Sequence, residues 1–215
     1  WCVLMTSKLL TMVVVTYGQA DHKLPLFLHS CALQEDQNFR VLLIHDGQEI
    51  NGFDDSYPRT QKVVNQFQDD WSSGKQTLNP QFELEFFGTA ERFNDWGHSL
   101  RAIGLEKCDT KYINWNNGDN YITPLFTKLL LASAEENSLD VSFCDILHNY
   151  PNVNFDGKGP YNVLNSRLAL NQTDMSNFIV KTKLAKAVGF NHRSFAADGL
   201  FIEELLKMFP AIKSG

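Results

Sequence analysis

Residues 112–124 read YINWNNGDNYITP, and they contain the change from strand to helix that best indicates the fold. Tyr112, Ile113 and Trp115 are aromatic or β-branched, which is typical of a buried strand. The run Asn-Asn-Gly-Asp then ends the strand. A helix is predicted to follow, with Thr123 as its N-cap and Pro124 at its first position.

Gly118 permits a tight turn after this strand. We therefore expect the amide of Asn117 and the carboxylate of Asp119 to project together from the strand end. Hard oxygen ligands of this kind suit Mn²⁺ or Mg²⁺ that keeps some of its water and shares a phosphate-bearing ligand. The alternative interpretation is a plain turn between strand and helix, because Asn, Gly and Asp are common turn residues.

The composition indicates one globular domain. The chain has 215 residues, of which 43% are hydrophobic and 20% charged, and its net charge of −6 argues against a general nucleic-acid binder. No apolar run approaches the roughly 20 residues that span a bilayer. The four cysteines form no Cys-x-x-Cys pair, which disfavours a zinc knuckle and indicates core cysteines in a reducing compartment.

Helical and strand patterns alternate along the chain. Strands are expected at residues 11–17, 39–44, 82–87, 112–115, 139–146 and 178–180, and helices at 23–34, 60–71, 97–108, 123–136, 182–188 and 198–209. A strand, a helix and a second strand at this spacing form a right-handed parallel crossover. The sequence therefore predicts an α/β fold with a mostly parallel central sheet flanked by helices. Residues 148–173 are irregular, and loops of this length inside a compact domain are usually functional or mobile.

In such a sheet, ligands bind beyond the carboxyl ends of the strands. Three segments are expected at that edge: residues 16–18, 45–47 and 116–119. Neither G-x-G-x-x-G nor G-x-x-x-x-G-K-[ST] occurs, which disfavours a Rossmann dinucleotide site and a P-loop. The remaining interpretation is a nucleotide held by the first two segments, with a metal-bridged diphosphate at the third.

At this point the chain resembles a known family. It contains Val13-Val14-Val15-Thr16-Tyr17-Gly18, then Ile44-His45-Asp46-Gly47, then Asn117-Gly118-Asp119 followed by Pro124, and finally Ala197-Asp198 before a helix. This order resembles GT-A glycosyltransferases, in particular glycosyltransferase family 2 and its relatives, and it also resembles the N-terminal domains of chlorovirus-encoded glycosyltransferases. Each motif is weak alone, whereas the ordered set covers almost the whole chain.

The resemblance implies roles for individual residues. It places Thr16, Tyr17 and Gly18 around the nucleoside of a UDP-sugar, and Asp46, followed by Gly47, on the base. It places Asp119 on Mn²⁺ or Mg²⁺, with Asn117 and Gly118 completing the donor-binding turn, and it assigns the catalytic base to Asp198. Two positions depart from the family pattern: Asn117 and Ala197 stand where the family has carboxylates.

Each of these residues also has a simpler interpretation. Asp46-Gly47 is a common turn signal, and Asp198 is a good helix N-cap. His148 or His192 could complete a metal shell, although isolated histidines usually lie at the surface. A phosphate could be contacted by Arg101, Lys181 and Arg193, although solvent-exposed positions are the simpler expectation for these three residues. A sugar could stack on Trp96, Trp115 or Tyr150, although packing in the core is the simpler expectation for these aromatic residues.

Together these features predict a metal-dependent, inverting glycosyltransferase that moves a hexose or deoxyhexose from a UDP-sugar to a hydroxyl of a glycan or glycoprotein. The alternatives are a nucleotidyltransferase and a non-catalytic nucleotide-sugar or glycan-binding module. Residues 1–9 are expected to be a lead-in and 10–215 a single domain, with 10–124 binding the nucleotide and 125–215 the acceptor. We expect a soluble protein of the cytoplasm (of the host cytoplasm if viral), with no nucleic-acid partner and no membrane span.

Overall fold

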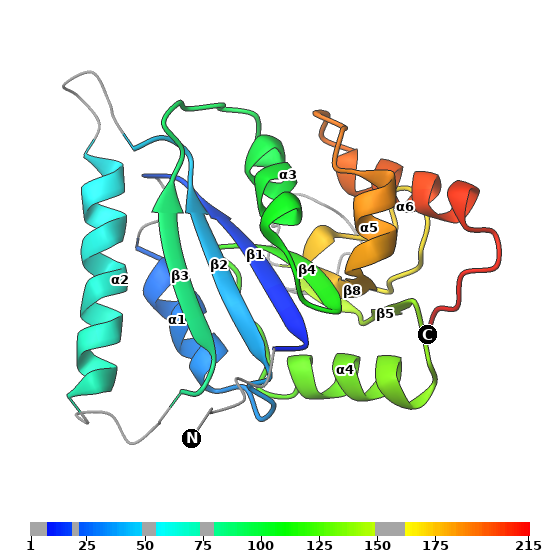
Figure 1. Cartoon of the computed structure of the whole chain (residues 1–215), viewed down its shortest axis with the longest axis horizontal. Helices are drawn as coiled ribbons and strands as arrows, with labels where there is room; N and C mark the ends of the chain where they lie inside the picture. Colours follow the sequence, from blue (N-terminus) through cyan, green and yellow to red (C-terminus); the bar gives the residue numbers. More distant parts are fainter. Residues whose placement is uncertain (1–7, 19–21, 49–54, 74–79, 149–161) are drawn as a thin grey trace, which may run out of the picture.

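The computed structural model describes residues 8–18, 22–48, 55–73, 80–148 and 162–215 (Figure 1). Its centre is a six-stranded sheet in the order β3-β2-β1-β4-β8-β5, and a separate two-stranded sheet pairs β6 with β7. The strands are β1 (Leu10–Thr16), β2 (Phe39–His45), β3 (Glu83–Gly88), β4 (Tyr112–Asn117), β5 (Val141–Phe143), β6 (Ile146–His148), β7 (Asn162–Leu164) and β8 (Phe178–Lys181).

Helices cover both faces of the main sheet (Figure 1). They are α1 (Leu24–Ala32), α2 (Ser56–Ser72), α3 (His98–Lys107), α4 (Phe126–Glu136), α5 (Thr182–Val188) and α6 (Ala197–Met208), with a short 3-10 helix, η2 (Met175–Asn177). Buried residues of α1, α2 and α4 share one core with the sheet, and those of α3, α5 and α6 share the other. The molecule therefore has three layers, helix, sheet and helix.

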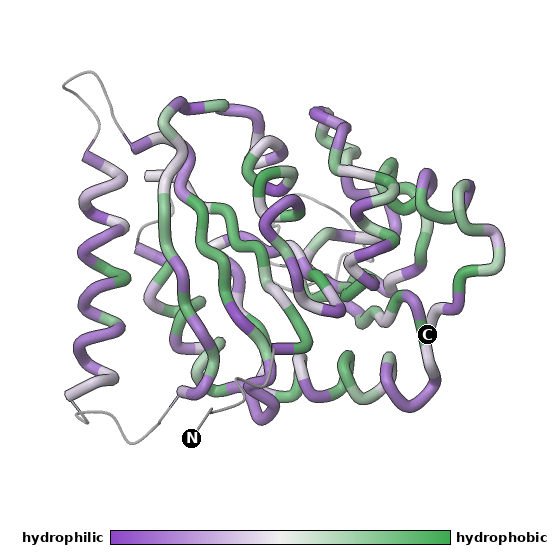
Figure 2. The backbone as a smooth tube through the Cα atoms, viewed as in Figure 1, coloured by the Kyte–Doolittle hydropathy of each residue, from purple (hydrophilic) through white to green (hydrophobic). Residues whose placement is uncertain are grey.

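The alternation of side chains along β1 explains these two cores. All seven residues of β1 are buried. Met12 and Val14 pack into the α1 face, while Val13 and Val15 pack into the α3 face. A strand covered on both sides needs a continuous β-branched or apolar run, which is what the sequence contains. Figure 2 shows the same contrast between hydrophobic central strands and a largely hydrophilic α2.

The order of the strands positions the site. Strands β1, β2, β3 and β4 are parallel, and β8 runs antiparallel to its neighbours β4 and β5. The chain winds outward through β2 and β3 on one side of β1, and then crosses through α3 to β4 on the other side. The switch in strand order therefore lies between β1 and β4, where open α/β sheets bind ligands.

The predicted α/β class with a mostly parallel sheet is confirmed. Two local predictions are wrong. Helix α4 begins at Phe126 with Leu125 at the N-cap, so Pro124 does not occupy its first position and Thr123 does not cap it. The side chain of Gln34 performs that task instead, because its Oε1 accepts hydrogen bonds from the backbone N–H and the hydroxyl of Thr127, each at 3.1 Å.

The second wrong prediction is a single strand at residues 139–146. This segment contains all of β5 and only the beginning of β6, and the two strands belong to different sheets. In the described part of the chain no helix is both long and apolar enough to cross a bilayer. Residues 1–7 of the expected lead-in lie outside the described residues, as do residues 149–161 of the irregular segment.

Candidate active site

The three segments predicted at the sheet edge do lie side by side. In the register of the strands Thr16 is opposite His45 and Val15 is opposite Asn117. The backbone N–H of Asp46 donates to Thr16 O at 3.1 Å, and the N–H of Gly118 donates to Val15 O at 3.0 Å. Parallel pairing thus brings residues 16–18, 46–47 and 117–119 to one edge, at the switch point.

Glycines in two of these segments allow close approach between loops and helices. A Cβ on Gly18 would lie 2.3 Å from Cβ of Ser56, at the start of α2. A Cβ on Gly118 would lie 3.3 Å from both Leu24 and Thr16, which brings the turn after β4 against the first residue of α1. Tyr17, between these contacts, is about half exposed and available to a ligand. Residues 19–21 lie outside the described residues.

Asp46 is buried and organises a neighbouring loop. Its Oδ1 accepts from the N–H of Phe93 at 2.8 Å and its Oδ2 from the N–H of Asn94 at 2.9 Å. Gly47 follows with a φ of +93°, which favours glycine, and its N–H donates to the hydroxyl of Thr89 at 3.0 Å. Asp46 therefore has a structural role, and a carboxylate with two such bonds still has lone pairs for a further donor.

Asn117 turns toward the α3 face of the sheet. Its Oδ1 accepts a hydrogen bond from the Nη2 of Arg101 at 2.8 Å. Arg101 also donates from Nη1 to the carbonyl oxygen of Trp96 at 2.9 Å, and it is buried. The expectation of a solvated Arg101 is therefore wrong. Its spacing from Gly104, Leu105 and Cys108 places it on the buried stripe of α3, a signal that could have revealed this position.

Asp119 turns instead toward α1. Its Oδ2 lies 3.6 Å from Nζ of Lys23, and both side chains are partly exposed. Asn117 thus pairs with Arg101 of α3, and Asp119 pairs with Lys23, which immediately precedes α1 on the opposite face of the sheet. This differs from the expected joint projection of the two side chains. Among the described residues, no three His, Cys, Asp or Glu side chains gather closely enough to hold a metal ion. The turn after β4 therefore offers a divalent ion one carboxylate ligand, that of Asp119. The rest of the coordination shell would come from water and a bound diphosphate.

Asp198 lies in the first turn of α6, whose N-cap is Ala196. The capping interpretation of Asp198 is therefore wrong. Its Oδ2 accepts from the N–H of Met175 at 3.2 Å. Burial, and then the negative charge of Asp174, raise the pKa of Asp198 to about 6, while Arg101 and backbone N–H groups partly offset the rise. A carboxylate in this environment is suited to accept a proton near neutral pH.

Asp174 acts electrostatically on both Asp198 and Arg101, and the sequence alone did not reveal it as a site residue. Its Oδ1 accepts from both the N–H and the hydroxyl of Ser176, at 2.8 and 2.6 Å, and so caps η2. Asp174, Asp198 and Asp95 all act on Arg101, opposing the fall in its pKa that burial causes. No local pattern indicates that Asp174 and Asp198, which are 24 residues apart, lie close together.

The other candidates have different surroundings. Nε2 of His192 lies 3.0 Å from Oε1 of Glu204 on α6, and the side chain of His148 lies outside the described residues. Trp115 is fully buried, as expected for core packing, whereas Trp96 is 72% exposed and contradicts that expectation. Trp96 also has a φ of +57°, and the next loop at this edge presents Phe195 at 93% exposure. An ion pair of 3.3 Å between Arg193 and Asp95 joins the two loops.

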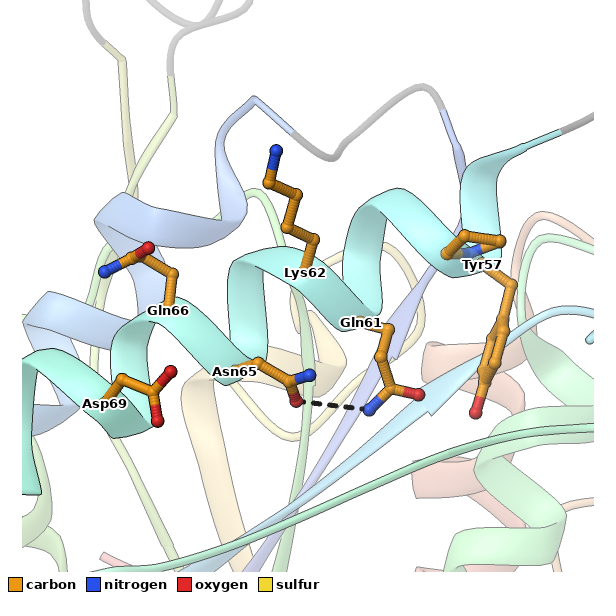
Figure 3. A pocket seen from close by; sticks show the side chains of 7 residues that line it. Tyr57, Gln61, Lys62, Asn65, Gln66 and Asp69 are labelled. Atoms are coloured by element: carbon orange, nitrogen blue, oxygen red, sulfur yellow. Dashed lines mark hydrogen bonds between the residues drawn. The ribbon is translucent and has the colours of Figure 1, made fainter.

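Two cavities lie elsewhere on the described surface. One of about 460 Å³ follows the outer side of α2 from Tyr57 to Asp69, where Nε2 of Gln61 donates to Asn65 at 3.4 Å (Figure 3). The second, of about 550 Å³, is lined by residues that include Lys111, Lys181 and Lys186. Neither is lined by Asp46, Asp119 or Asp198. The candidate site is therefore identified by the side chains that lie together at the ends of β1, β2 and β4, and not by a cavity.

Comparison with solved structures identifies other chains with this fold, and one of them is a mannosyltransferase. S. aureus TarS matches over 91% of this chain and 33% of its own, with a TM-score of 0.62 and 19% identity. TarS 1–349 in complex with UDP-GlcNAc matches over 91% and 52%, with a TM-score of 0.61 and 21% identity. The mannosyltransferase PcManGT from Pyrobaculum calidifontis, in complex with GDP-Man and Mn²⁺, matches over 96% and 53%, with a TM-score of 0.65 and 12% identity.

The chain spans a third to about half of the length of these structures. At such identities the likeness shows the fold alone. No protein-family model matches the chain, and a search of curated proteins finds no match either.

Proposed function

We propose that this chain is a glycosyltransferase domain that moves a hexose or deoxyhexose from a UDP-sugar to a hydroxyl of a glycan or glycoprotein, with inversion at the anomeric carbon. The observation that carries this proposal is the environment of Asp198. A buried carboxylate with a pKa of about 6 lies in the first turn of a helix, with Asp174 beside it and Arg101 extending toward the turn after β4. Perturbed carboxylates of this kind concentrate at functional sites.

The chemistry assigned to Asp198 is general-base catalysis. Asp198 takes the proton from the acceptor hydroxyl while that oxygen bonds to the anomeric carbon, and the bond from this carbon to the diphosphate breaks with its electron pair leaving on the diphosphate. Attack opposite to the leaving group inverts the configuration. Arg101 and Asp174 do not touch the substrate in this scheme; their charges act on Asp198, with Asp174 raising its pKa and Arg101 lowering it.

The donor assignment draws on the edge residues and on the fold. Thr16, Tyr17 and Gly18 adjoin Asp46, which has acceptor capacity for the N3–H of uracil beyond its two backbone bonds. Structures of the same fold were solved with UDP-GlcNAc and with GDP-Man, so nucleotide sugars of either base suit the architecture. A divalent ion held by Asp119 would act as a Lewis acid on the departing diphosphate.

The proposal is tested by incubating the protein with UDP-glucose, UDP-galactose and UDP-GlcNAc and measuring the release of UDP, with CDP-glucose as the base control. We expect slow hydrolysis or transfer with at least one UDP-sugar and none with the CDP-sugar. Absence of turnover, and of binding by UDP in calorimetry, would contradict the proposal.

A second candidate is a binding module that keeps the fold without the chemistry. Asn117 and Ala197 favour it, because both are neutral where the resembling family has carboxylates, and the Asn117 amide oxygen is already bonded to Arg101. This module would bind UDP-sugars and yet release no UDP with any acceptor. The cytoplasmic location, viral origin and division at residue 124 stay predictions, as does the nucleotidyltransferase alternative.

A further inference from the structure

The turn after β4 has an unusual charge balance. It contains one carboxylate, Asp119, and two side-chain cations contact it: Lys23 at Asp119 and Arg101 at Asn117. A metal-binding turn normally presents an excess of negative charge to the ion, because Coulomb attraction holds a hard dication. Here the protein itself already supplies the positive charge.

Asn117 is the origin of this balance. An aspartate at this position would offset the charge of Arg101 and add a ligand for a metal. The neutral amide does neither, since its Oδ1 accepts from the Arg101 guanidinium at 2.8 Å. A divalent ion placed at Asp119 therefore has no second anionic ligand from the turn, and it lies on the side of the turn from which Lys23 approaches.

Lys23 is placed to meet a phosphate. It immediately precedes α1, and the first residue of that helix, Leu24, packs near Gly118 of the turn. The positive end of the helix dipole adds to the ammonium charge at this point. Its contact with Asp119 is 3.6 Å long and partly exposed, and such pairs are weak in water. An entering diphosphate, with more charge than one carboxylate, can therefore displace Asp119 from Lys23.

We propose that Lys23 is a donor-binding residue whose ammonium contacts the diphosphate, so that nucleotide binding keeps a large part of its strength without a divalent ion. This inference rests on the proposed function and deepens it. A divalent ion at Asp119 then adds to the positive charge that Lys23 already presents to the diphosphate. For that reason the chain tolerates the neutral Asn117 where the family that it resembles has a carboxylate.

The test is calorimetric titration of UDP in EDTA and in Mn²⁺, with thermal midpoints to confirm folding. For the unaltered chain we expect removal of Mn²⁺ to weaken UDP by about tenfold or less. Lys23→Met should weaken UDP in EDTA by about tenfold or more, the usual effect of losing a charge-assisted bond. Lys62→Met, which removes an exposed lysine on α2, is the matched control and should change nothing.

Two further variants give opposite signatures. Asp119→Asn should bind UDP in EDTA at least as well as the unaltered chain, because Lys23 is released from its carboxylate, while losing the gain from Mn²⁺. Asn117→Asp should bind Mn²⁺ more tightly without nucleotide, measured by electron paramagnetic resonance, and should make UDP binding more dependent on Mn²⁺.

The outcomes separate the two proposals. Binding of UDP only with Mn²⁺, or equal UDP affinity of Lys23→Met and the unaltered chain in EDTA, overturns the role of Lys23 and leaves the proposed function intact. No binding of UDP in either condition overturns the proposed function, and the role of Lys23 with it.

Discussion

Arg101 and Asn117 form a hydrogen bond of 2.8 Å from the guanidinium Nη2 to the amide Oδ1. This contact joins α3 to the last residue of β4, and the same guanidinium lies within electrostatic reach of Asp198 and Asp174. The buried guanidinium of Arg101 thus interacts both with the turn after β4 and with the carboxylates of Asp174 and Asp198.

Asp198→Asn should remove turnover and spare donor binding. An amide cannot accept the acceptor proton, and general-base catalysis is typically worth roughly 10²–10⁴-fold in rate. The measurement is the rate of UDP release with an acceptor, beside calorimetric affinity for the UDP-sugar. Turnover within a few-fold of the unaltered chain would rule out Asp198 as the base.

The same variant should be more stable than the unaltered chain at neutral pH. The folded pKa of Asp198, about 6, lies above its ordinary value of 3.8. The folded state therefore binds the proton more tightly, and the free energy of unfolding falls as the pH rises from about 4 to 6. The loss amounts to about 3 kcal/mol above pH 6. Denaturant midpoints should thus favour Asp198→Asn at pH 7.5 and coincide near pH 4; a pH-independent difference would contradict the raised pKa.

Asp174→Asn should move the acid limb of the pH–rate profile to lower pH. Activity of the unaltered chain is expected to rise as the pH increases through about 6, because Asp198 must be ionised. Removing the negative neighbour lowers the pKa of Asp198, while Asn keeps the cap of η2. An unshifted limb would mean that Asp174 only caps its helix.

Arg101→Met should shift that limb in the opposite direction. Without the guanidinium, the pKa of Asp198 rises further and the rate at pH 6 falls more than the rate at pH 8. The variant also removes the hydrogen bonds that Asn117 Oδ1 and the Trp96 carbonyl accept, and both acceptors are only partly buried, so the loss of stability should be modest. Arg101→Lys is the control, since it keeps the charge and should restore the limb in part.

Asp46→Asn should reduce the preference for UDP over CDP. Uracil carries an N3–H donor that cytosine lacks, and a charge-assisted bond to it is worth roughly 1.5–3 kcal/mol. The ratio of the two affinities is the informative quantity, because Asp46 also holds the N–H groups of Phe93 and Asn94, and any substitution loosens that loop. An unchanged ratio would leave Asp46 with its structural role alone.

The fold was predictable because its signals are local. The β-branched run of β1 indicates burial on both faces, and strand and helix spacing indicates parallel crossovers. Once the strands are parallel, their carboxyl ends must meet, so Thr16, Asp46 and Asn117 could be placed at one edge from the sequence.

The finer geometry depends on contacts between distant segments. Arginine is usually exposed, and only its position on the stripe with Gly104 and Leu105 indicates burial. Likewise, Thr123 has the properties of a cap, but Gln34, which precedes it by 89 residues, satisfies the start of α4. The directions of Asn117 and Asp119 could not be predicted, because each depends on which helix supplies the nearer cation.

The placement of Lys23 and α1 on one face of the sheet and of Arg101 and α6 on the other has a consequence for redesign. Substitutions at separated sites without shared partners combine additively. Substitutions that change the charge at Lys23, beside α1, should therefore not alter the pKa of Asp198 on α6, and the reverse should also hold. Asn117 is the exception, because a substitution there would affect both sides. Strands β1 and β4 separate the two sides, so the binding of the diphosphate leaving group and the pH range in which the domain is active can be changed separately.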